Sequence, residues 1–157
     1  MKKSKSKSLL DVCLLGAAVL FGALTMLLMI APGIINKINI GLSIEERISV
    51  YSLINYADEL KFGVLLAVIF AACLLVSALL SLVLKLMDKK TKADALIAFC
   101  AGILGVIAGV LLFMTKSLVG LADSGITSLG IGAILGGVFA IIGGLALVGY
   151  AALKMKK

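Results

Sequence analysis

The chain has 157 residues, of which 62% are hydrophobic, and it carries 15 Lys and Arg against 8 Asp and Glu, a formal net charge of +7. Soluble domains are roughly 45–50% apolar, so this composition excludes an ordinary soluble fold. The lysines have no arginine or aromatic residues interleaved among them, and we therefore expect no nucleic-acid partner.

Four long apolar blocks lie between the clusters of charge, at residues 9–31, 62–84, 95–114 and 127–153. Each has about 20 residues or more, the length that an α-helix needs to cross a hydrocarbon layer of about 30 Å. None shows the polar face of a surface helix in a soluble protein. The sequence therefore predicts an all-α fold: a single transmembrane domain over residues 1–157, built as an antiparallel four-helix bundle.

The lysines indicate how this bundle is oriented. The N-terminal tail carries four, the second connection four and the C-terminus three, so eleven of the fifteen basic residues fall on one side. The first connection sums to one negative charge. By the positive-inside rule both termini are cytoplasmic, in a multi-pass protein of the cell membrane with the lipid bilayer as its first partner. We interpret the first block as an uncleaved span, because it is longer than the apolar region of a signal peptide.

The outer segment 32–61 contains a helix start signal. Ser43 and Glu46 have the spacing of a capping box, which predicts a short helix from about residue 43. This helix either lies on the outer membrane surface or extends the second span outward. Four residues would share its apolar face and form an outer-surface interaction site: Ile44, Ile48, Tyr51 and Ile54.

Polar residues near the later spans predict local contacts. We expect the Ser81 hydroxyl to bond the carbonyl one turn back in the second span. Thr91 with Asp94 three residues on indicates the start of the third helix. Ser124 or Thr127 would cap the fourth helix.

The fourth span, "GIGAILGGVFAIIGGLALVGYAAL" (130–153), is sorted by side-chain size rather than polarity. At 100° per residue its glycines and alanines fall within an arc of about 140°, and the third span has a similar face. In lipid, such faces let helix backbones approach closely. They meet inside one bundle, or the fourth span offers its face to another copy or a partner subunit. The predicted helix-packing residues are Gly102, Gly105, Gly109, Gly132, Gly136, Gly137, Gly143 and Gly144.

The chain lacks the residues of several chemistries. Its glycine spacing, G-x-G-x-x-x-G with no following lysine, does not match a nucleotide loop. There is no histidine and no acid pair at mid-membrane, and Asp11, the one acid within a span, lies near its cytoplasmic end. The three cysteines have no C-x-x-C spacing and are expected to be small packing residues. We expect no catalytic site, no metal and no cofactor, and therefore no enzyme.

Three resemblances concern topology. With four spans and glycine-rich helices the chain resembles the proteolipid of rotary ATPases, but its fourth span has no carboxylate for ion transfer. With cytoplasmic ends and a larger first outer loop it resembles claudin and tetraspanin-like proteins, without a tryptophan or an outer-loop cysteine pair. The stretch "ISVYSLINYADELKFG" (48–63) before an alanine and leucine helix is similar to small four-span membrane proteins of low-GC bacteria. These resemblances imply the bundle and no activity.

Two functions are compatible with this composition. The first is a structural or accessory membrane protein that associates with itself or with another membrane protein through its small-residue helix faces. The alternative is a passive conduit, either a holin-like pore former or a carrier of small apolar solutes. Few polar atoms and no proline interrupt the spans, so a coupled ion path is not expected.

Overall fold

The computed structural model describes residues 2–39, 43–55, 61–87, 92–118 and 127–155, and within them it is mainly helical. Four helices are long and apolar enough to cross a membrane, over Leu9–Leu28, Phe62–Leu86, Ala93–Phe113 and Ile131–Met155. They belong to α1 (Lys2–Leu28), α3 (Lys61–Leu86), α4 (Lys92–Phe113) and α6 (Ile131–Met155).

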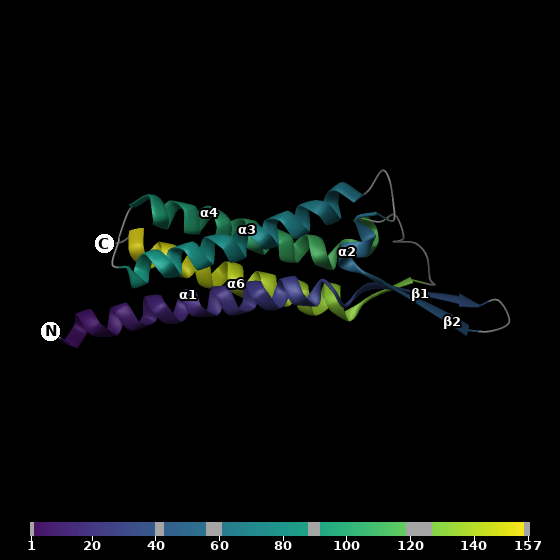
Figure 1. Cartoon of the computed structure of the whole chain (residues 1–157), viewed down its shortest axis with the longest axis horizontal. Helices are drawn as coiled ribbons and strands as arrows, with labels where there is room; N and C mark the ends of the chain where they lie inside the picture. Colours follow the sequence, from purple (N-terminus) through teal and green to yellow (C-terminus); the bar gives the residue numbers. More distant parts are fainter. Residues whose placement is uncertain (1, 40–42, 56–60, 88–91, 119–126, 156–157) are drawn as a thin grey trace.

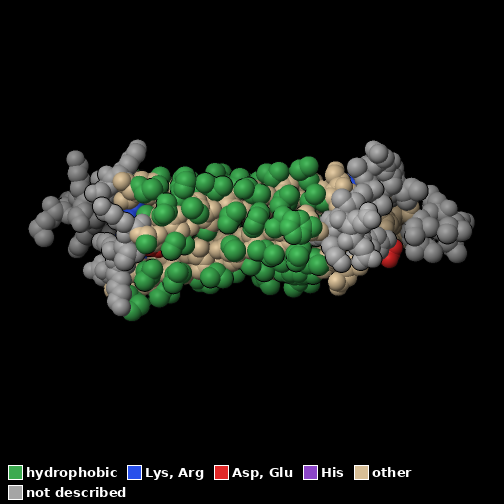
Figure 2. All heavy atoms as spheres, turned by 90° about the horizontal axis from the view of Figure 1, so that it is seen from above, with side chains coloured by type: hydrophobic (Ala, Val, Ile, Leu, Met, Phe, Trp, Pro, Cys, Tyr) green, Lys and Arg blue, Asp and Glu red, His purple; other side chains and the backbone are tan. Residues whose placement is uncertain are grey.

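The four long helices form one elongated bundle, with both chain ends at the same end of it (Figure 1). α6 packs along α1 and α4, and α3 packs along the same two helices on the other side. Successive long helices run in opposite directions, so these four packed pairs are antiparallel. On the face seen in Figure 2, hydrophobic side chains cover the middle of the bundle and the coloured charged side chains lie toward its ends.

The outer segment differs from the prediction, because it forms a small sheet. The chain after α1 makes a hairpin of β1 (Pro32–Asn39) and β2 (Ser43–Ser49), and the short β3 (Thr127–Leu129) pairs with β1 on its other side. All pairs are antiparallel, in the order β2-β1-β3. The all-α expectation therefore omits a three-stranded sheet, which lies beyond one end of the bundle (Figure 1).

The helix predicted from about residue 43 is wrong, because residues 43–49 are strand β2. A single helical turn, α2 (Val50–Leu53), follows instead, and Ser49 caps it by accepting a hydrogen bond from the Ser52 N–H at 3.1 Å. Thr127 is likewise in β3 and does not cap the fourth helix, while Ser124 lies outside the described residues. A second single turn, α5 (Thr115–Leu118), follows α4.

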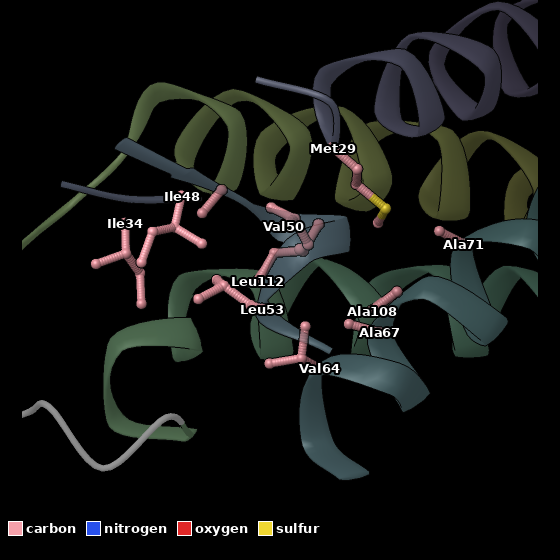
Figure 3. Packing of buried hydrophobic residues seen from close by; sticks show 11 residues of the cluster. Met29, Ile34, Ile48, Val50, Leu53, Val64, Ala67, Ala71, Ala108 and Leu112 are labelled. Carbon is pink, nitrogen blue, oxygen red and sulfur yellow. The ribbon is translucent and has the colours of Figure 1, made fainter. Parts of the chain in front are cut away.

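Two apolar clusters fill the bundle. The sheet-end cluster joins the sheet and α2 to the helices. Figure 3 shows Leu53 of α2 next to Leu112 of α4, with Ile34 and Ile48 of the strands on one side and Ala108 of α4 on the other. The second cluster lies toward the chain termini and contains Leu15, Leu74 and Leu147, all fully buried. We call these regions the sheet end and the terminal end of the bundle.

Candidate functional site

The predicted glycines of α4 and α6 lie against each other as two reciprocal pairs. A Cβ atom placed on Gly144 would lie 2.6 Å from the Gly102 carbonyl oxygen, and one on Gly102 would lie 2.8 Å from that of Gly144. Gly109 and Gly137 are related in the same way, at 2.7 and 3.0 Å. The pairs are seven residues apart on both helices, so the two backbones touch at two levels about two turns apart.

The other predicted glycines face different neighbours. On α6, a Cβ on Gly132 would meet the carbonyl oxygens of Leu28 and Ala31 at 2.5 Å, whereas one on Gly136 would find nothing closer than 3.5 Å. Gly143 faces Phe21 and Ala18 of α1, and Gly105 of α4 faces Leu74 of α3. All eight glycines therefore contact segments of the same chain.

Thr25 adds a polar contact to the seam between α1 and α6. Its hydroxyl is 2.8 Å from the Phe21 carbonyl oxygen, one turn back, and 3.4 Å from the Gly136 carbonyl oxygen on α6. Thr25 is fully buried. A hydroxyl that bonds its own helix costs little in lipid and remains close enough to hold a neighbouring helix.

The opposite face of α6 carries large apolar side chains. Ile131, Ile134, Val138, Ile142 and Leu145 are exposed on it. The helix is thus largely divided by side-chain size: its small residues face α1 and α4 and most of its large residues face the surroundings, with Leu147 and Tyr150 as the buried exceptions. The cysteines behave differently from the packing role expected for them, because Cys13, Cys73 and Cys100 are all exposed.

The terminal end holds a buried polar cluster that sequence reasoning missed. Asp94 of α4 is 3% exposed and accepts hydrogen bonds from the Ser81 hydroxyl at 2.7 Å, the Tyr150 hydroxyl at 3.2 Å and the Lys154 ammonium. Lys154 also donates to the Tyr150 hydroxyl at 2.9 Å. We call these four residues the Asp94 cluster. It ties α3, α4 and α6 together, and Ser81 bonds a carboxylate rather than the carbonyl one turn back.

A second ion pair joins α1 to α3 at the same end. Asp11 of α1 and Lys85 of α3 are 2.8 Å apart, and their side chains are only 8% and 10% exposed. Among the described residues, no group of three or more His, Cys, Asp and Glu is placed to hold a metal ion. These charges are paired with one another across helices, which is the arrangement that makes buried charge tolerable.

The outer-surface residues pack against the protein itself. Ile48 is 7% exposed within the sheet-end cluster, and Tyr51 and Ile54 pack against that cluster from its edge. The Tyr51 hydroxyl donates to the Met26 carbonyl oxygen at 3.0 Å, and burial raises the pKa of Tyr51. Ile44 lies in β2 opposite Ile38, with its side chain outside the described residues.

The exposed side of the hairpin is charged. Glu45 lies 3.4 Å from Arg47 of the same strand and 3.7 Å from Lys37 of β1. The side chains of Lys37 and Arg47 are 64% exposed and that of Glu45 is 43% exposed. Such exposed pairs contribute little to stability.

Comparison with known proteins gives no relative from which a function could be transferred. No protein-family model, curated protein or solved structure matches this chain. The resemblances to four-span families remain predictions about topology, and the function has to be argued from the helices, the polar clusters and the sheet.

Proposed function

We propose that this chain is a non-enzymatic, multi-pass protein of the cell membrane that acts as an accessory protein by binding another protein outside the bilayer. Four apolar helices of spanning length support the membrane location. The lysine-rich tail, second connection and C-terminus support an orientation with both termini in the cytoplasm and the sheet outside.

One observation carries the proposal: the glycine surfaces contact the chain's own helices, whereas the hairpin extends past the bundle with exposed charges. The pairs Gly102 with Gly144 and Gly109 with Gly137 occupy the α4 and α6 faces that a partner helix would need. Glu45 and Arg47, in contrast, are exposed on the edge strand β2. We therefore assign partner binding to the sheet rather than to the small-residue helix faces.

The conduit alternative has less support. Fully buried side chains fill the space between the helices at both ends of the bundle. They include Leu112 at the sheet end and Leu15, Leu74 and Leu147 at the terminal end. A path for solutes needs polar groups or an open lumen along the bundle. The described charged side chains within the spans are instead paired at the terminal end.

Site-specific photo-crosslinking in native membranes tests this proposal. A photoreactive amino acid at Arg47 should give a discrete protein adduct, and the same residue at Leu145, which is 58% exposed on α6, should crosslink only to lipid. Protein adducts at position 145 and none at position 47 would show that the partner binds the helices instead of the sheet. The absence of any adduct at position 47 would overturn the proposal.

A further inference from the structure

Strand β2 is the edge of the sheet, paired on one side by β1 among the described residues. An edge strand presents backbone N–H and C=O groups that another strand can pair with, and proteins commonly protect such edges with charged side chains. The three central residues of β2, Glu45, Glu46 and Arg47, are all exposed. Whether they prevent or promote pairing depends on which charges meet.

The order of residues in β2 makes the strand complementary to itself. Residues 43–49 read S-I-E-E-R-I-S. In an antiparallel pair centred on Glu46, Ser43 lies opposite Ser49 and Ile44 opposite Ile48, while Glu45 lies opposite Arg47 on both sides of the centre. Directly opposed unlike charges stabilise an antiparallel pair, and opposed like charges destabilise it. The charges on this edge therefore favour a second copy.

We propose that β2 pairs antiparallel with β2 of a second copy of this chain, with the two-fold axis at Glu46. This inference rests on the proposed function, in which the sheet binds a protein, and it identifies that protein as a second copy of the chain. Each interface would contain two Glu45 to Arg47 contacts related by the two-fold axis, as in any isologous dimer. Glu46 meets its own counterpart at the centre, a like-charge contact that keeps the association weak.

The direction of the hairpin determines how the two copies are arranged. β1 and β2 extend along the long axis of the bundle, away from the helices (Figure 1). Antiparallel pairing requires a two-fold axis perpendicular to β2, so the two bundles point in opposite directions. Two copies inserted in one membrane point the same way. The pairing therefore joins copies in two facing membranes.

Exchanging charges tests the pairing. Glu45→Arg gives two positive residues and Arg47→Glu gives two negative ones, so each variant repels itself and complements the other. We expect wild-type proteoliposomes that carry the sheet outward to cluster, and vesicles with either variant alone to cluster about tenfold less. Mixing the two variant populations should restore clustering. Failure of the mixture to restore it, or normal clustering by either variant alone, would overturn the pairing.

Two further measurements separate this inference from a folding defect and from the proposed function. Thermal unfolding in detergent should be unchanged for both variants, because exposed substitutions have small effects. In a cysteine-free background, Glu46→Cys should form a disulfide-linked dimer, and Lys37→Cys on β1, the matched control, should not. If the photo-crosslinker at Arg47 captures a different protein while Glu46→Cys stays monomeric, the proposed function stands and this inference fails.

Discussion

The sheet end and the terminal end of the bundle are closed by different kinds of contact. At the sheet end, apolar side chains such as Ile34 and Leu53 fill the space beneath a hydrogen-bonded sheet. At the terminal end, Asp94 and Asp11 are buried and paired with Lys154 and Lys85. Apolar packing tolerates substitutions of similar volume, whereas a buried charge is costly once its oppositely charged partner is removed. Both ends contain buried apolar side chains, and the terminal end adds buried ion pairs, so we expect it to be the more sensitive of the two to loss of a single polar side chain.

Removing one buried charge should have the largest effect. Asp94→Ala leaves the Lys154 ammonium and the Tyr150 hydroxyl without their acceptor. We expect a loss of about 3–5 kcal/mol, nearer the lower value because Lys154 is partly exposed. Chemical unfolding in detergent measures it. The double variant Asp94→Leu with Lys154→Met should recover most of the loss, and a loss under about 1 kcal/mol would show that water screens the cluster.

A cavity at the sheet end should come next. Leu53 is fully buried, so Leu53→Ala should cost about 2–5 kcal/mol, depending on how far its neighbours relax. Hydrogen exchange locates the effect: protection should fall in β1 and α2 and persist around Asp94. Leu145→Ala, on an exposed position of α6, is the control. Equal loss of protection at both ends would remove the distinction drawn between them.

Between the two ends, the glycine pairs allow a finer test. Gly144→Ala places a Cβ 2.6 Å from the Gly102 carbonyl oxygen and should cost about 1–3 kcal/mol, as overpacking does. Gly136→Ala, on the same helix, meets its nearest atom at 3.5 Å, an ordinary van der Waals contact, and should change stability by under about 0.5 kcal/mol. Thermal unfolding compares the two variants. Similar losses would mean that the backbones of α4 and α6 do not touch as described.

The smallest effect concerns the hydrogen bond that holds α2 to α1. Tyr51→Phe removes the donor to the Met26 carbonyl and should cost about 0.5–1.5 kcal/mol near neutral pH. Burial raises the pKa of Tyr51 in the folded protein, so above about pH 10 the unfolded chain ionises first and this stabilisation is lost. The difference between wild type and variant should shrink as pH rises through that range. A difference independent of pH would contradict the raised pKa of Tyr51, and the absence of any difference at neutral pH would contradict the bond.

Hydropathy alone predicted the four helices, since a long apolar block has few stable alternatives. The sheet was missed because Ser43 with Glu46 matches a capping box, and Ile44 and Ile48 fit a helical face as well as an alternating strand. The signal for a hairpin was the isoleucine-rich composition on both sides of Gly41. β3, with three residues, is too short for any pattern to reveal.

The buried ion pairs could not be predicted from a local sequence pattern. Asp94 and Lys154 are separated by 60 residues, and each sits at a helix end where a charge is commonly solvated. Only the register of α4 against α6, set by the glycine contacts, brings them together. Side-chain size in the fourth span was readable from the sequence, but the neighbour that each glycine meets depends on the rotation of every helix in the bundle.

If the four long helices span a membrane, as we propose, the position of β3 and α6 late in the chain affects the order of assembly. β3 pairs with β1, and α6 lies between α1 and α4. A nascent chain that has not yet reached residue 127 contains α1, α3 and α4 but has neither β3 to pair with β1 nor α6 to cover the small residues of α4. Such an intermediate lacks the close helix contacts that hold the finished bundle. Docking of the last long helix therefore completes the sheet and the helix packing in a single step.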